Sequence, residues 1–295
     1  MTAATRKNAQ SNRDTLFVES GELLDTEEFP GQQYIMRIRA PKCAAAAKPG
    51  SFVHISCDDE LPMRRPMSIM RATEDRIEIL YKVVGDGLRL LASKRVGDTV
   101  NVLGPIGRPF TPDPGRPNCL LLGGGVGIPP MVFLADSLRD DRRWQTLAIF
   151  GSEIPFPFDL QPSTLATPWL DDDVNSAMPL LENWGIPSRL SSESDFEGCF
   201  RGYVTDLAEQ WLQSLDNVEL AKTQLFACGP TPMLQAVAAL AERYDLPCQV
   251  SLEEFMACAV GGCAGCTVEI TTPHGPAMKR VCVDGPVFEA SSVVW

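Results

Sequence analysis

The sequence predicts a multi-domain α+β fold: an N-terminal antiparallel β-barrel, an α/β domain built on a parallel sheet, and a small C-terminal cysteine-loop region. Three observations support this. Short β-forming segments separated by turns fill residues 15–113, strands alternate with helical segments in residues 114–247, and closely spaced cysteines dominate residues 248–295. A chain of 295 residues is long enough for two domains and a small appendage.

The composition is that of a globular protein with an acidic surface, with 44% hydrophobic residues, 22% charged residues and a net charge of -12. Negative charge repels phosphate backbones, so we expect no nucleic acid partner. The most apolar stretch, residues 120–135, is interrupted by glycines and prolines and is too short to span a membrane. Residues 1–14 are polar and lack the apolar core of a secretory signal, which predicts a flexible leader and a cytoplasmic protein.

The barrel is predicted from segments rich in β-forming residues, partly alternating and separated by turns that contain glycine or proline. One helical interval, residues 87–94, interrupts them. The expected strands are residues 16–19, 34–39, 52–55, 76–83 and 99–103.

A motif between two of these strands reads Arg64-Arg65-Pro66-Met67-Ser68-Ile69. An arginine three residues before a serine, on an extended segment, can put a guanidinium on a diphosphate and a hydroxyl near a ring system. Taken alone, the same pattern also fits a pair of surface arginines at a strand end.

A second domain is expected after the proline- and glycine-rich linker at residues 113–117. Its first strand, residues 119–122, runs into four glycines and then a helical segment at residues 131–138, and a further strand covers residues 146–150. Such glycines let a diphosphate approach backbone N–H groups at a helix N-terminus, although a tight turn would need them too. The strand–glycine–helix order favours nucleotide binding. The glycines are Gly123, Gly124, Gly125 and Gly127.

A third motif, Cys228-Gly229-Pro230-Thr231-Pro232-Met233, ends the strand at residues 225–228 and begins a helix at about residue 232. Ligands of open α/β sheets bind at this edge, although the motif also fits a simple helix start. Gly151-Ser152-Glu153 follows the second strand of the domain, with no arginine or lysine nearby for a 2′-phosphate, which favours NAD over NADP. The two histidines, His54 and His274, receive no role.

The cysteines of the C-terminal region follow the spacing Cys-x4-Cys-x2-Cys, with a fourth cysteine after fifteen further residues. This is the arrangement that holds a [2Fe–2S] cluster on four thiolates in plant-type ferredoxins. Glycines between the cysteines permit the unusual backbone angles of a loop that wraps a cluster. A structural zinc site is the alternative, although zinc sites usually pair two short Cys-x2-Cys units. The four residues are Cys258, Cys263, Cys266 and Cys282.

In this order the motifs resemble the ferredoxin–NADP reductase superfamily. With the cysteine loop, the chain resembles the family of electron transfer subunits (iron–sulfur flavoproteins) of the NAD-dependent dihydroorotate dehydrogenase, over nearly all of its length after residue 14. The resemblance is carried by residues 65–68, 80–87, 102–107, 123–130, 202–206, 228–230 and 254–288.

The resemblance implies sites for FAD, NAD(H) and a [2Fe–2S] cluster, with Ser68 and Cys228 as catalytic residues near the reacting rings. Leu88 departs from the family, which usually has a threonine whose hydroxyl helps to hold the FAD diphosphate. The implied FAD residues are Arg65, Pro66, Met67, Ser68, Leu80, Tyr81, Lys82, Gly87 and Leu88. The implied NAD residues are Gly123, Gly124, Gly125, Gly127, Cys228, Gly229, Pro230 and Met233.

The resemblance also implies a function in pyrimidine biosynthesis. Electrons would pass between a partner dehydrogenase that contains FMN, the cluster, FAD and NAD(H), with net flow toward NAD in the dihydroorotate dehydrogenase complex. Other reductases with the same domain order share these motifs. The alternative function is therefore that of a subunit of a ferredoxin-dependent NAD(P) oxidoreductase or transhydrogenase, or of a hydrogenase diaphorase. A zinc-stabilised binding module without redox activity is the remote alternative.

Overall fold

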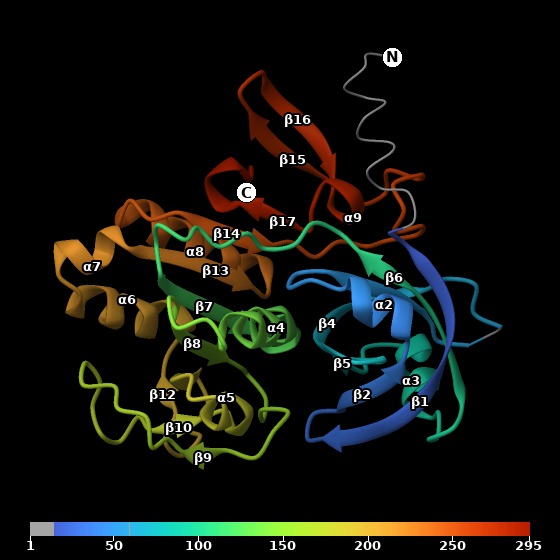
Figure 1. Ribbon diagram of the computed structural model, residues 1–295, viewed down its shortest axis with the longest axis horizontal. Helices are drawn as coiled ribbons and strands as arrows, with labels where there is room; N and C mark the ends of the chain where they lie inside the picture. Colours follow the sequence, from blue (N-terminus) through green and yellow to red (C-terminus); the bar gives the residue numbers. More distant parts are fainter. Residues whose placement is uncertain (1–14, 59) are drawn as a thin grey trace.

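The computed structural model describes residues 15–58 and 60–295, so the expected leader at residues 1–14 lies outside the described residues. A closed six-stranded antiparallel barrel comes first, followed by a seven-stranded sheet with helices and a C-terminal hairpin region. Figure 1 shows the barrel on the right, the sheet on the left and the C-terminal region above both. The expected multi-domain α+β architecture is confirmed.

The barrel strands follow the order β1-β2-β5-β4-β3-β6. β1 and β2 are joined by a three-residue turn, Pro30 to Gln32, in which Gly31 and Gln32 both have positive φ angles. Two short helices, α2 (Pro41–Ala46) and α3 (Asp86–Ala92), interrupt the strands. The strands are β1 (Phe17–Phe29), β2 (Gln33–Arg39), β3 (Phe52–Ser56), β4 (Arg65–Thr73), β5 (Arg76–Lys82) and β6 (Thr99–Ile106).

β4 differs from the sequence expectation, because the segment that begins at Arg65 is itself a barrel strand and not a connection between two strands. Pro66 obscured this in the sequence, since proline cannot donate to a ladder and usually argues against a strand. In the barrel Pro66 lies opposite His54 of β3, near the start of the strand. The Arg65–Ser68 motif is therefore held by β-pairing.

The central sheet has the strand order β12-β11-β8-β7-β13-β14-β17, and all its strands are parallel except β17. β7 is buried at every position, as expected for a strand covered on both faces. β14 lies within residues 248–295, so the sheet extends into the range predicted for the cysteine-loop region. The boundaries between the predicted domains stay a prediction. The strands are β7 (Asn118–Gly124), β8 (Gln145–Gly151), β11 (Ser188–Ser192), β12 (Phe200–Arg201), β13 (Thr223–Cys228), β14 (Cys248–Ser251) and β17 (Val287–Glu289), and a separate pair is β9 (Gln161–Pro162) with β10 (Ser176–Ala177).

The helices of this domain connect the strands, and none of the described helices is long and apolar enough to cross a membrane. α4 is buried along most of its length and starts with two prolines in its first turn, where their missing N–H groups cost nothing. The helices are α4 (Ile128–Leu138), α5 (Pro179–Asn183), α6 (Val204–Ser214), α7 (Asn217–Ala221) and α8 (Thr231–Arg243), with the 3-10 turns η1 (Gly125–Gly127) and η2 (Ala290–Ser292).

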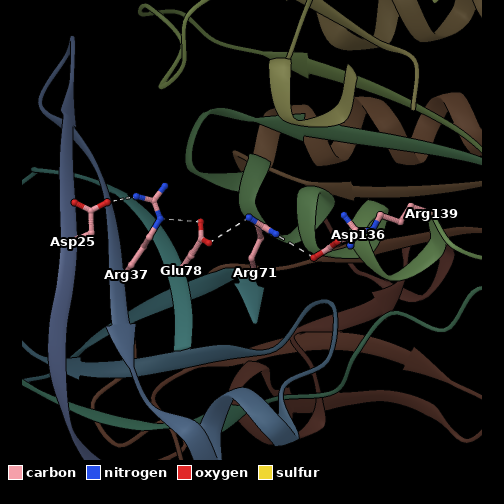
Figure 2. A network of polar contacts seen from close by, with 6 residues as sticks. All are labelled: Asp25, Arg37, Arg71, Glu78, Asp136 and Arg139. Carbon is pink, nitrogen blue, oxygen red and sulfur yellow. Dashed lines mark hydrogen bonds and ion pairs between the residues drawn. The ribbon is translucent and has the colours of Figure 1, made fainter. Parts of the chain in front are cut away.

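α4 joins the two domains, since it lies between the central sheet and the barrel (Figure 1). Phe133 of this helix packs into the barrel core, and Met70 and Leu80 of the barrel pack into the core shared by α4 and the sheet. A chain of ion pairs crosses the same boundary, as Figure 2 shows. It runs through Asp25, Arg37, Glu78, Arg71, Asp136 and Arg139.

The guanidinium groups of Arg71 and Arg139 also lie over the ring of Trp184, at 5.4 Å and 4.8 Å from its centroid. Arg71 belongs to barrel strand β4, whereas Arg139 and Trp184 belong to the α/β domain. Cation–π contacts and partly buried ion pairs therefore supplement the apolar packing at one boundary. The two domains are held in a defined mutual orientation.

The C-terminal region consists of a hairpin, a short helix α9 (Val281–Asp284) and β17. The hairpin strands are β15 (Thr267–Thr272) and β16 (Gly275–Arg280). This region contacts the barrel directly: the Arg108 N–H donates to the Gly285 carbonyl at 2.6 Å, and a Cβ added at Gly107 would lie 2.4 Å from Pro286. The cysteine loop is therefore carried by the sheet on one side and the barrel on the other.

Candidate functional site

The expected diphosphate site on the barrel is formed where β4 meets α3. The Arg65 guanidinium lies over Gly87, so that a Cβ added at Gly87 would lie 3.2 Å from Nη2 of Arg65. Among the described residues, the Arg65 guanidinium donates only to the backbone carbonyls of Met63, at 2.8 Å, and Arg64, at 3.2 Å. A cation without a carboxylate partner beside a glycine at a helix start is suited to a diphosphate.

The other residues expected at FAD fall into two groups. Ser68, Pro66 and Lys82 are partly exposed. Met67, Tyr81 and Leu88 are buried in the barrel core, and Leu80 is buried against α4. Residues of the buried group can therefore reach a ligand only through their backbone. The Leu88 side chain points into the core and offers no hydroxyl to a ligand.

The glycine loop and the Cys228 motif meet at the carboxyl edge of the sheet. Gly123 lies opposite Cys228 in the parallel pairing of β7 with β13. A Cβ added at Gly127 would lie 2.3 Å from the Cys228 carbonyl oxygen, and one at Gly124 would lie 2.5 Å from Sδ of Met233. Glycine is therefore required for the two motifs to approach. At Gly125 the φ of +54° favours glycine, and a Cβ there would meet nothing within 4 Å.

Cys228 is fully buried at this edge. Burial raises the pKa of its thiol, and the nearby Glu253 carboxylate raises it further, so the thiol stays protonated at neutral pH. Glu253 itself keeps contact with solvent, yet protein surrounds it closely enough that desolvation raises its pKa. Glu253 was not identified from the sequence. The one signal that could have indicated it is its position shortly after β14, a strand that ends at this edge of the sheet. The catalytic role of Cys228 stays a prediction.

An acidic group lies beside the second strand of the domain. The Tyr203 hydroxyl donates to Glu193 at 2.8 Å, and the carboxylates of Glu193, Asp206 and Glu153 all raise the pKa of Tyr203, most of all through that hydrogen bond. Asp206 also accepts from the Tyr203 N–H at 3.0 Å. Glu153, which follows β8, was expected here from the sequence. Glu193 follows a different strand, β11, and was not expected.

The cysteine loop has the backbone expected of a wrapping loop. Ala259, Gly261 and Ala264 have positive φ angles. N–H groups of Gly262 and Cys263 point at Sγ of Cys258, at 3.3 Å and 3.4 Å. Amide donors aimed at sulfur are the outer contacts that stabilise a cluster bound by thiolates. The donor set fits an iron–sulfur cluster.

The four cysteines lie as two pairs. Cys258 and Cys263 are at the surface, whereas Cys266 and Cys282 are buried and are drawn together by the hydrogen bond from the Val281 N–H to the Cys266 carbonyl at 2.8 Å. Burial raises the pKa of Cys258, but N–H donors outweigh this and lower it to about 6; burial and the neighbouring Cys266 thiol raise the pKa of Cys282 to about 12. As they stand, no three such side chains in the described part are close enough to hold a metal ion. Their joint ligation stays a prediction that requires the pairs to approach each other.

The family model that matches this chain is the iron–sulfur cluster binding domain of dihydroorotate dehydrogenase B, over residues 253–294. Similar curated proteins are electron transfer subunits of dihydroorotate dehydrogenase B (NAD(+)). The protein from Desulforamulus reducens is 32% identical over 89% of this chain and 92% of its own length. That from Bacillus caldolyticus is 34% identical over 84% and 87%.

Solved structures with a similar fold include an NADH-dependent reduced ferredoxin-NADP oxidoreductase described in connection with flavin-based electron bifurcation. It has a TM-score of 0.76 and 24% identity, and the match covers 94% of this chain and 90% of that one. A ferredoxin reductase of carbazole 1,9a-dioxygenase has a TM-score of 0.58 and 20% identity over 79% and 67%. At these identities the likeness concerns the fold.

Proposed function

Because the chain belongs to the family of dihydroorotate dehydrogenase B electron transfer subunits, we propose that it carries electrons between NAD(H), FAD, a [2Fe–2S] cluster and a catalytic dehydrogenase subunit. The family is one of oxidoreductase subunits. One observation carries the proposal, which is that the three motifs converge. The cysteine loop lies against β3, which pairs with the strand that bears Arg65 and Ser68, and Glu253, just before that loop, lies beside Cys228 at the sheet edge.

The bound cofactors would supply the chemistry, namely hydride exchange between NAD(H) and FAD and single-electron transfer between FAD and the cluster. The chain's part is to hold and orient them. Arg65 and the start of α3 bind the FAD diphosphate, the glycine loop binds the dinucleotide, and Cys258, Cys263, Cys266 and Cys282 ligate the cluster. The nicotinamide is proposed to approach the sheet edge where β13 and β14 end, at which the Glu253 carboxylate lies beside the buried, protonated Cys228 thiol.

Ser68 is proposed to hydrogen-bond near the reactive nitrogen of the flavin. Ser68→Ala is therefore expected to slow reduction of the flavin by NADH about tenfold, the value of one hydrogen bond, while FAD stays bound. Stopped-flow absorbance measures the rate, and Ser93→Ala is the matched control because its hydroxyl only caps the Leu90 carbonyl at an exposed helix end. Unchanged reduction kinetics in Ser68→Ala would refute the role.

NAD is proposed as the nucleotide, because the 2′-phosphate of NADP would meet Glu153, Glu193 and Asp206. Glu193→Arg is expected to lower the KM for NADPH about tenfold and to leave the kcat with NADH nearly unchanged. Steady-state kinetics with both nucleotides measure this. Glu242→Arg makes the same charge change at the exposed end of α8, the helix that leads to β14 on the far side of the sheet from β11. This control variant should not alter the preference for NADH over NADPH. An equal response of the two variants would contradict the assignment.

The partner is proposed to be a catalytic subunit that contains FMN. Purification of the native complex tests this: a co-purifying FMN dehydrogenase that reduces NAD with dihydroorotate supports it, and a second large flavoprotein would instead indicate a ferredoxin-dependent transhydrogenase or a hydrogenase diaphorase. The absorption spectrum separates the zinc alternative, because flavin and iron–sulfur bands are expected and a colourless protein that contains zinc would overturn the proposal.

A further inference from the structure

The outer face of β3 is covered by the C-terminal region. Side chains alternate along a strand, and Val53 and Ile55 fill the barrel core. Phe52 and His54 therefore point the other way. Phe52 packs in the same apolar cluster as Met256 and Cys266 of the cysteine loop, so this face of β3 is the seam between the barrel and that loop.

His54 is a polar residue of this face, and its exposed fraction is 0%. Neither ring nitrogen makes a hydrogen bond to any described residue. Burial lowers the pKa of the His54 imidazole most, and the charge of Arg64 lowers it further. The backbone carbonyls of Arg64 and Met256 beside the ring act in the opposite direction but are outweighed, so the pKa falls to about 4. The imidazole is therefore neutral, with one N–H to donate and one lone pair.

The two carbonyls beside the imidazole belong to the two cofactor segments. Arg64 directly precedes Arg65 of the proposed FAD site, and Met256 lies two residues before Cys258 of the proposed cluster site. The Arg64 carbonyl already accepts from the Arg65 guanidinium at 3.2 Å. The Met256 carbonyl is the acceptor beside the ring that belongs to the cysteine loop, and a bond to it from the single N–H of His54 would link that loop to β3.

We propose that His54 is a positioning residue that ties the cysteine loop to the flavin strand: a small rotation of its neutral ring lets its N–H donate to the Met256 carbonyl and so sets the separation of the bound cluster and FAD. This inference rests on the proposed function. Electron transfer slows steeply as two centres separate, and contacts behind the first ligands commonly change metal-site affinity or activity about 10- to 100-fold. The His54 contact therefore acts on the flavin-to-cluster step and leaves the nicotinamide-to-flavin step alone.

The test uses the full chain as purified, with His54→Leu, His54→Gln and the control His274→Leu. His274 is the other histidine of the sequence and lies exposed in the turn of the β15–β16 hairpin. Hydrogen–deuterium exchange of residues 254–264 is expected to rise in His54→Leu, to be partly restored in His54→Gln, which keeps an N–H donor, and to stay unchanged in His274→Leu. Stopped-flow absorbance with NADH is expected to record normal flavin reduction and about 10- to 100-fold slower cluster reduction in His54→Leu.

Unchanged exchange and unchanged cluster reduction in His54→Leu would overturn the inference. If His54→Leu does not fold, His54→Gln decides: residues 254–264 that exchange more slowly than an exposed loop support the donor role, and residues 254–264 that exchange as fast as an exposed loop overturn it. A wild-type chain that binds neither flavin nor cluster would refute the proposed function instead, and the exchange measurement still tests the His54 contact in that chain.

Discussion

Cys266→Ala is expected to remove the iron–sulfur cluster and abolish electron transfer to the partner, while NADH still reduces the flavin. Cys266 is one of the two buried cysteines among the four proposed cluster ligands, and it lies just before β15, held beside Cys282 by the hydrogen bond from the Val281 N–H. A [2Fe–2S] cluster needs four protein ligands, and an alanine supplies none. The flavin and nucleotide residues lie on β4, α3 and the sheet edge, so the substitution does not touch them.

Iron and sulfide content, the electron paramagnetic resonance signal of the reduced protein and two activity assays measure this effect. Ferricyanide accepts electrons directly from flavin, so its reduction by NADH should persist, whereas turnover with the dehydrogenase partner should fall to background. Cys199→Ala is the matched control, because Cys199 is a partly buried cysteine of the α/β domain outside the loop. Full cluster content in Cys266→Ala would exclude this cysteine as a ligand.

Arg65→Ala is expected to weaken FAD binding about 10- to 100-fold, since hydrogen bonds to a charged group contribute about 1.5–3 kcal/mol each. The guanidinium lies over Gly87 without a carboxylate partner among the described residues. Leu88 offers no hydroxyl and is buried in the barrel core, so the diphosphate depends more heavily on Arg65 here. Loss of FAD also removes every reaction that starts from NADH.

Fluorescence of released FAD during dilution or titration measures the affinity. Arg89→Ala is the control, because Arg89 lies on α3, the short helix that contains Gly87, but is exposed and bonds to Asp86. An equal loss in both variants would point to destabilised α3 and contradict a specific contact with the diphosphate. An unchanged affinity in Arg65→Ala would remove Arg65 from the site.

The motifs predicted from the sequence are those whose chemistry depends on neighbours along the chain. Cysteine spacing predicted the loop, and the run from β7 through Gly123 into α4 predicted the nucleotide edge. Backbone requirements make such motifs visible in a sequence: a loop with positive φ angles or a close approach at Gly127 demands particular residues at particular positions. β4 was missed because Pro66 masks a strand whose pairing partners lie on β3 and β5.

The residues that were missed act across elements. Glu253 approaches Cys228 because β14 pairs with β13, and Glu193 reaches Tyr203 because β11 ends beside the start of α6. Arg71 meets Asp136 only where the barrel packs against α4 (Figure 2). No spacing along the chain encodes these contacts.

The sequence by itself determined which cofactor classes this chain is built for, since ligand type, glycine placement and strand–turn–helix order are local properties. Only the tertiary structure decided the positions of those sites relative to one another. It brought the cysteine loop onto the outer face of β3 and put His54 at the seam. The physical reason is that mutual position comes from apolar packing and pairing between segments distant in sequence, such as Phe52 with Met256.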